Sequence, residues 1–302
     1  MAVQYHFAHG DSVVGAGVLA GGPYECASGS TWLALTRCMA PRFWSPLPEP
    51  AAMRERVERR RAEGRIDGVA ALSGDRVWLF SGGRDETVEG PVMDALATLY
   101  AGYLPEADVV RENLADAGHA MISVEEPAPN ACDTSEPPYI NRCGDFDAAG
   151  RLLAVIHGPL ADPVEPPPDA VRAFDQRPFL GDDPAASGMA DAGYVLVPPA
   201  CEAGGCRVHV AFHGCRQTSA QIGDRFVQNA GYIEWGWSND LVILFPQVRP
   251  THGWTGGFSW LFNPRGCWDW WGYTDTLYAT REGRQVRAVR RMIDRLAESP
   301  PG

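Results

Sequence analysis

The sequence lacks several features that would assign it to a common functional class. It contains no lysine, so all 26 basic residues are arginine, which indicates a GC-rich coding sequence rather than a particular chemistry. No apolar run approaches the roughly 20 residues that a membrane-spanning helix needs. The first residues also lack the basic and apolar regions of a secretory signal peptide. A net charge of −12 and a pI near 5.0 argue against nucleic acid or an anionic membrane as the main partner.

The eight cysteines do not follow the repeated CxxC spacing of a zinc site. We predict four disulfides and an oxidising, extracellular location, with reduced core thiols as the alternative. Disulfides indicate secretion, but this chain has no signal peptide, and the two observations conflict. We therefore expect the beginning of the protein to be missing from this chain. Six cysteines form local pairs and two are left over, which pairs Cys26 with Cys38, Cys132 with Cys143, Cys201 with Cys206 and Cys215 with Cys267.

The order of strands and helices predicts an α/β fold. A helical pattern over residues 1–10 is followed at once by an apolar run at 13–20, which is half of an α/β unit without the strand that should precede it. We expect a mostly parallel, doubly wound sheet with helices on both faces, in one domain over residues 1–302. The proline-rich stretch 159–187 is interpreted as a surface traverse. The other predicted strands are 76–80, a run near 109, 194–197, 207–212 and 241–246, and the other helices are 51–65, 91–103, 148–156 and 283–296.

The apolar run 208–212 ends abruptly at His213, Gly214 and Cys215. The glycine permits a sharp turn that leaves backbone N–H groups unpaired at the end of a buried strand. In α/β-hydrolases, a turn of this kind after an early strand supplies an N–H of the oxyanion hole. The alternative is a core strand that ends in an ordinary tight turn.

Two residues at strand ends could use such an oxyanion hole. Asp85 lies in the glycine-rich loop after the strand 76–80, and His119 lies in a loop after the next strand, directly behind a glycine. A carboxylate and a histidine on successive strand-end loops are the orienting acid and the general base of a hydrolytic triad. Alternatively, Asp85 caps the following helix and His119 is an ordinary exposed histidine.

No serine of the chain stands in the G-x-S-x-G motif that would make it the nucleophile. Ser12 follows a glycine and an aspartate, but the esterase motif of that pattern follows a strand, whereas Ser12 follows a helix. Ser81 and Ser187 precede a glycine and lack the one upstream. Cys215 is better explained as half of a disulfide than as a thiol nucleophile.

Three tryptophans, Trp268, Trp270 and Trp271, stand within four positions and cannot all face a core by simple alternation. A Cys215–Cys267 disulfide would tether some of them, exposed, near the Cys215 turn. Such a patch suits an apolar polymer or the acyl chain of an ester. The alternative is that the tryptophans pack beneath a long loop.

Seven motifs spread over nearly the whole chain resemble, in the same order, those of the single-domain extracellular poly(3-hydroxybutyrate) depolymerases. The α/β-hydrolase fold of that family is circularly permuted, which would explain why the run 208–212 follows the acid and the histidine. The motifs are AGGPYEC (20–26), SGGRDETV (81–88), AGH (117–119), PPYINRC (137–143), VAFHGCRQ (210–217), DRFVQNAGY (224–232) and NPRGCWDW (263–270).

The resemblance implies that Asp85 and His119 are the acid and base of the triad. It also implies that the N–H of Cys215 belongs to the oxyanion hole, that Trp270 contacts the substrate and that the disulfides are paired as above. The expected protein is a secreted, monomeric carboxylesterase that hydrolyses polyhydroxybutyrate-like polyesters through an acyl-enzyme, without a metal or cofactor.

The chain departs from the family at the nucleophile. In this family the serine lies near the N-terminus in GLSSGGYMA, after a strand, and Met1 and Ala2 align with the end of that motif. The resemblance thus implies that this chain lacks the nucleophile and its strand, and we expect it to be inactive as given. Two alternatives remain: a feruloyl or acetyl-xylan type esterase on the same scaffold, and a non-catalytic protein that adsorbs to polymer through its tryptophans.

Overall fold

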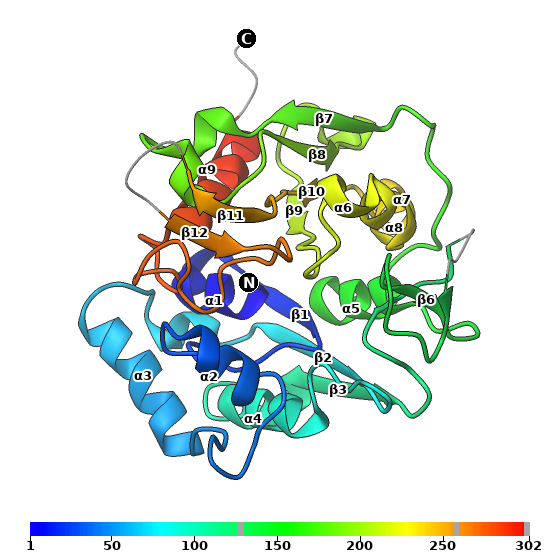
Figure 1. Cartoon of the computed structure of the whole chain (residues 1–302). Coiled ribbons are helices and arrows are strands. Elements are labelled where there is room, and N and C mark those ends of the chain that lie inside the picture. Colours follow the sequence, from blue (N-terminus) through cyan, green and yellow to red (C-terminus); the bar gives the residue numbers. More distant parts are fainter. Residues whose placement is uncertain (126–129, 256–259, 299–302) are drawn as a thin grey trace.

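Strands and helices alternate along most of the chain in the computed structural model, which describes residues 1–125, 130–255 and 260–298 (Figure 1). Every strand and helix predicted above is present, with ends that differ by a few residues. The helices are α1 (Ala2–Ala8), α2 (Thr31–Thr36), α3 (Pro50–Ala62), α4 (Gly90–Tyr100), α5 (Ala148–His157), α6 (Ser219–Ile222), α7 (Arg225–Asn229), α8 (Tyr232–Ser238) and α9 (Arg284–Ala297). The strands are β1 (Gly15–Leu19), β2 (Arg76–Gly82), β3 (Val109–Leu114), β4 (Met121–Ile122), β5 (Asn130–Ala131), β6 (Ile140–Arg142), β7 (Val171–Asp175), β8 (Ala192–Leu196), β9 (Arg207–Val210), β10 (Leu241–Phe245), β11 (Thr251–Trp254) and β12 (Trp260–Asn263).

The larger strands form two sheets rather than one continuous sheet. One has the order β1-β2-β3 and is parallel throughout. The other has the order β7-β8-β10-β9, in which β9 and β10 are parallel and the β7–β8 and β8–β10 pairs are antiparallel. Small sheets are formed by β4-β6-β5 and by the β11–β12 pair. The α/β class is therefore confirmed, and the predicted single sheet is divided between β1 and β9.

Helices cover both faces of the sheets, as the sequence predicts. Alternate residues of β2 point to opposite sides: Val77 and Leu79 join a core cluster with residues of α1, α3, α4 and α9, whereas Trp78 and Phe80 join another with residues of α5, α7 and α8. α4 and α5 accordingly lie on opposite sides of β2 (Figure 1). β10 contributes to both clusters in the same way. The sharing of both clusters by the two sheets supports the single-domain prediction, which stays a prediction.

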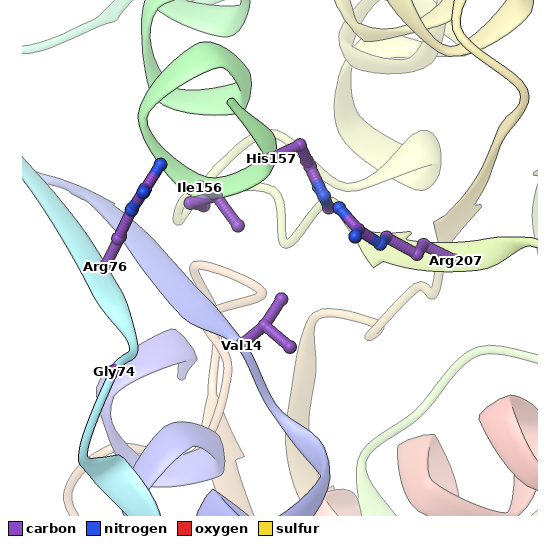
Figure 2. A pocket seen from close by; sticks show the side chains of 6 residues that line it. All are labelled: Val14, Gly74, Arg76, Ile156, His157 and Arg207. Atoms are coloured by element: carbon purple, nitrogen blue, oxygen red, sulfur yellow. The ribbon is translucent and has the colours of Figure 1, made fainter. Parts of the chain in front are cut away.

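A cavity of about 250 Å³ lies where β1 and β9 begin (Figure 2). Val14 immediately precedes β1, and Arg207 is the first residue of β9; both line the cavity, together with His157 at the end of α5. Burial, helped by Arg207, lowers the pKa of His157 to about 4, so its ring is neutral at pH 7. The edge strands of the two sheets thus begin beside one cavity and do not pair with each other. Because Asp85 follows the other end of β2, this cavity is separate from the predicted site.

The proline-rich traverse contains a strand that the sequence did not predict. β7 lies within residues 159–187 and pairs with β8 at the edge of its sheet. Its side chains are mostly exposed, so it carries no apolar alternation that would mark a strand. The β11–β12 hairpin was also not predicted. The longest described helix, α9, has 14 residues, and no helix in the described ranges is long and apolar enough to cross a membrane.

Candidate active site

Asp85 is fixed in a tight loop at the carboxyl end of β2. The N–H of Asp85 donates to the carbonyl of Gly82 at 3.2 Å, and the N–H of Arg84 donates to the carbonyl of Ala117 at 2.9 Å. A Cβ atom on Gly82 would lie 2.2 Å from that Ala117 oxygen, so only glycine allows the two loops to approach this closely. The glycines of the SGG motif therefore bring the Asp85 loop against the loop that carries His119.

Asp85 and His119 form a hydrogen-bonded pair. Oδ2 of the buried Asp85 lies 2.7 Å from Nδ1 of His119, and Oδ1 accepts the backbone N–H groups of Thr87 and Val88, each at 2.8 Å. An ionised carboxylate can only accept hydrogen bonds, so Nδ1 carries the proton and Nε2 presents its lone pair. No hydrogen bond joins Nε2 to another residue in the described ranges. This tautomer is the one that a general base in a serine-hydrolase triad requires.

The loop closed by the Cys132–Cys143 disulfide holds the backbone of His119 in place. The backbone N–H of Gly118 donates to the carbonyl of Cys132, and that of His119 donates to Oγ of Ser135, both at 2.9 Å. The buried Asn141 donates to the Cys132 carbonyl at 3.0 Å, which closes the loop on itself. The disulfide and these hydrogen bonds together fix the backbone position of His119.

The turn after β9 leaves one N–H group without an acceptor. Among residues 214–217, the N–H of Gly214 donates to Oε1 of Gln217, that of Arg216 to the carbonyl of Arg265, and that of Gln217 to the carbonyl of Gly214. Of these four N–H groups, only that of Cys215 has no acceptor among the residues that the structure describes. An unpaired N–H at a strand end is the group that an oxyanion hole needs.

Tyr139 connects this turn to His119. Its ring lies edge-on to the imidazole, with the centroids 6.5 Å apart, and its hydroxyl accepts a hydrogen bond from Nη1 of Arg216 at 3.2 Å. The structure therefore brings Asp85, His119 and the Cys215 turn together through a continuous set of contacts. Tyr139 could not be identified as a site residue from the sequence, because nothing in its local pattern shows that it lies beside a residue 20 positions earlier.

His213, in the same turn, is a structural residue. Its side chain is buried, Nδ1 donates to the carbonyl of Gly214 at 2.8 Å, and Nε2 accepts the N–H of Val248 at 3.4 Å. Burial lowers the pKa of His213 to about 4, so it is neutral and both of its nitrogens are used. His213 is thus not the base.

The predicted Cys215–Cys267 disulfide joins the turn to the tryptophan loop, and the other three predicted disulfides are also present. Asp269 orders the loop, because its carboxylate accepts hydrogen bonds from the backbone N–H groups of Gly272, Tyr273 and Thr274 at 2.6–2.9 Å. The half-buried Trp270 projects from this loop and packs edge-on against Trp271, with the ring centroids 5.3 Å apart.

The disulfide between Cys26 and Cys38 has a structural role beside the tryptophan loop. It closes the segment that carries α2, and Cys26 and Cys38 are each 2% exposed. Both cysteines belong to a small buried apolar cluster that also contains Cys267 and Trp271. Cys38 is therefore not a residue that substrate could reach. It anchors the α2 segment against the loop that the Cys215–Cys267 bridge holds at the turn.

The expectation that some tryptophans of this loop are exposed is wrong for Trp268 and Trp271, and Trp270 is half-buried. Trp268 is 4% exposed and Trp271 is 8% exposed. Trp268 packs beneath the turn, with its ring centroid 5.0 Å from that of Phe212 and 5.5 Å from that of His213. The exposed large apolar side chains of the described ranges instead include two groups elsewhere: Trp32, Leu35, Phe43 and Trp44 in and after α2, and Trp254, Trp260 and Phe262 on the β11–β12 hairpin.

The serines considered above are engaged in other contacts. The hydroxyl of Ser12 donates to the carbonyl of His9, and that of Ser187 donates to the carbonyl of Pro184. Oγ of Ser81 accepts a hydrogen bond from Asn113. Within the described ranges, no three His, Cys, Asp or Glu side chains are grouped so that they could hold a metal ion.

An α/β fold with a carboxylate–histidine pair at strand ends is the arrangement of the α/β-hydrolases. No family model matches the chain. A poly(3-hydroxybutyrate) depolymerase of Delftia acidovorans is 38% identical over 309 residues, which cover 100% of this chain and 58% of that protein. A polyhydroxybutyrate depolymerase of Talaromyces funiculosus is 35% identical over 298 residues, which cover 96% of this chain and 84% of that protein.

Two solved structures are similar to this one. The crystal structure of a PHB depolymerase from Penicillium funiculosum matches with a TM-score of 0.80 and 33% identity, over 93% of this chain and 86% of that one. A PHB depolymerase in which one serine is replaced by alanine, complexed with an R3HB trimer, matches with the same TM-score and coverage at 32% identity. The chain therefore belongs to the polyhydroxybutyrate depolymerase family. It spans 58% of the length of the Delftia relative.

Proposed function

We propose that this chain carries the base, the orienting acid and an oxyanion donor of a carboxylesterase that hydrolyses polyhydroxybutyrate-like polyesters. The observation that carries the proposal is the 2.7 Å hydrogen bond between Asp85 and His119 beside a turn in which Cys215 has the free N–H. Membership of the depolymerase family supports the polyester as substrate. The four disulfides support an extracellular location, and we propose a monomer.

In the proposed reaction a serine hydroxyl oxygen attacks the ester carbonyl while Nε2 of His119 takes the hydroxyl proton. Asp85 holds the imidazole in its reactive tautomer and stabilises the imidazolium. The N–H of Cys215 donates to the tetrahedral oxyanion. The leaving alkoxide then takes the proton from His119, and water releases the acyl group by the same steps. Trp270, next to the turn, is proposed to contact the acyl chain.

No serine in G-x-S-x-G is present in these 302 residues, so we propose that the chain by itself does not turn over esters. The amino group of Met1 is buried close to Asp269, and burial lowers its pKa to about 5. A segment joined to Met1 would therefore start beside the tryptophan loop. This supports a test in which a strand-forming segment ending in GLSSGGY is joined to Met1; the product is called the extended protein below.

The substrate is tested by measuring what the extended protein releases. We expect 3-hydroxybutyrate from a polyhydroxybutyrate film and no ferulate from a feruloylated polysaccharide. Release of ferulate in place of 3-hydroxybutyrate would identify a feruloyl esterase instead. Binding can be tested on the chain as it is, because the similar depolymerase was complexed with an R3HB trimer after loss of a serine. Titration calorimetry with that trimer should therefore show saturable binding.

A non-catalytic polymer-binding role is favoured by one observation, the exposed aromatic side chains near α2 and on the β11–β12 hairpin. Phe43 is 90% exposed, and an exposed ring that large loses water contact when it lies against an apolar polymer surface. This role predicts adsorption to polymer granules that falls in Phe43→Ala and in Trp270→Ala, with Val164→Ala as an exposed apolar control. Adsorption without hydrolysis, even in the extended protein, would leave polymer binding as the function.

A further inference from the structure

Gln217 links the oxyanion turn to the segment beside His119. Its side chain is 5% exposed, and its Oε1 accepts the N–H of Gly214 at 2.7 Å. Its Nε2 donates to the carbonyls of Pro138 and Tyr139, each at 3.0 Å. One buried amide therefore joins two segments that are 78 residues apart in the sequence.

The turn is shaped to accept this side chain. A Cβ atom on Gly214 would lie 2.7 Å from Oε1 of Gln217, so a residue other than glycine would displace the Gln217 amide from this position. The Gln217 amide thus occupies the space beside Gly214 and takes the N–H that precedes that of Cys215. Without it, the Gly214 N–H would be unpaired next to the proposed oxyanion donor, and the peptide plane between His213 and Gly214 would lose the hydrogen bond that fixes it.

The backbone on both sides of Gln217 is held in a conformation that it would not adopt unaided. Arg216 has φ of 64° and Tyr139 has φ of 58°, in the left-handed region that side-chain-bearing residues rarely occupy. Such backbone persists only where the surrounding contacts determine it, and it is concentrated at functional sites. Gln217 directly follows one of these residues and binds the carbonyl of the other, and the Arg216–Tyr139 hydrogen bond joins the two.

We propose that Gln217 is a positioning residue that keeps the N–H of Cys215 free and sets its place relative to His119. It touches neither the substrate nor the reacting atoms. It acts by fixing the Gly214 N–H, next to Cys215, and the carbonyl of Tyr139, whose ring lies beside His119. This inference rests on the proposed function, because it assigns a purpose to the oxyanion turn.

The test uses the ¹⁵N-labelled 302-residue chain and the R3HB trimer as probe. In the wild-type chain, trimer binding should shift the amide proton resonance of Cys215 downfield, because this N–H then donates to the ester carbonyl. This change in chemical shift is called the Cys215 displacement below. Gln217→Met keeps the length of the side chain and removes all three hydrogen bonds. We expect it to abolish that displacement and to weaken trimer binding by about five- to tenfold, which is the size of one lost hydrogen bond.

Gln176→Met is the matched control. Gln176 is also buried, accepts one backbone N–H, that of Gln247, and donates to two carbonyls, those of Ala190 and Gln247, where β7 and β10 end in the same sheet as β9. Its loss should lower stability in the same way and leave trimer binding and the Cys215 displacement unchanged. A purely structural role for Gln217 predicts that both variants lose stability and that neither changes the bound state.

Gln217→Glu gives a second readout through pH. The ionised carboxylate can still accept from Gly214 but cannot donate to the carbonyls of Pro138 and Tyr139, whereas the protonated acid regains one donor. The Cys215 displacement should therefore be absent at high pH and return as pH falls in this variant, with no such change in the wild type. If Gln217→Met binds the trimer as tightly as the wild type does and shows the same Cys215 displacement, the inference about Gln217 is wrong. The proposed function is then unaffected. A wild-type chain that does not bind the trimer would overturn the proposed function and the inference together.

Discussion

Removing the Cys215–Cys267 disulfide should destabilise the protein more than removing any of the three local ones. This bridge spans 52 residues, whereas the Cys201–Cys206 bridge spans 5. If a disulfide acts by restricting the unfolded chain, loops of these lengths correspond to about 4 and about 2 kcal/mol. Each pair has one buried cysteine, Cys267 or Cys201, so truncation to alanine adds a similar small packing loss to both and leaves the difference to loop length.

The assay is reversible urea unfolding of two double variants, Cys215→Ala with Cys267→Ala and Cys201→Ala with Cys206→Ala. The first should lose about 2 kcal/mol more of unfolding free energy than the second. The backbone N–H of residue 215 is retained, so any change in trimer binding reports on the loss of the tether to the tryptophan loop. An equal or larger loss in the Cys201–Cys206 variant would refute the reasoning from loop length.

Two further predictions concern Gly82, which lies close to the carbonyl of Ala117, and the partly buried carboxyl group of Glu234. Gly82→Ala should lower stability by about 2 kcal/mol or more, because its Cβ would lie 2.2 Å from the Ala117 oxygen, while Gly68→Ala, which meets nothing within 4 Å, should be nearly neutral in thermal unfolding. Burial, together with the nearby acidic residues, raises the pKa of Glu234 from 4.5 to about 7. The contribution of Glu234 to stability is therefore full below pH 4.5 and is lost as pH rises through 7. Glu234→Gln should be more stable than the wild type at pH 8 and equal to it at pH 4 in urea unfolding; a benefit only at pH 4 would contradict this sign.

The parts of the site that lie on local patterns could be predicted from the sequence. Asp85 and His119 each follow a recognisable strand, and the ends of neighbouring parallel strands meet at one edge of a sheet. That arrangement is what places the carboxylate 2.7 Å from the imidazole. The disulfides could also be predicted, because three of the four are local in sequence.

The parts that depend on contacts between distant segments could not be predicted. Gln217 lies three residues after Gly214, but nothing in the sequence shows that its amide also reaches Tyr139. The burial of Trp268 likewise depends on Phe212, which meets it only after folding. The division of the sheet between β1 and β9 depends on how strands pair and not on the two strands themselves, both of which were predicted. The circular permutation stays a prediction.

The most direct measurement of the central claim is the rate of p-nitrophenyl butyrate hydrolysis by the 302-residue chain, the extended protein and its His119→Ala variant. The chain alone should be inactive, the extended protein should hydrolyse the ester, and His119→Ala should reduce that rate by about 10³-fold or more. Circular dichroism should first show that all three are folded. Hydrolysis by the chain alone that is lost on His119→Ala, or hydrolysis by the extended protein that survives it, would contradict the roles assigned to this site.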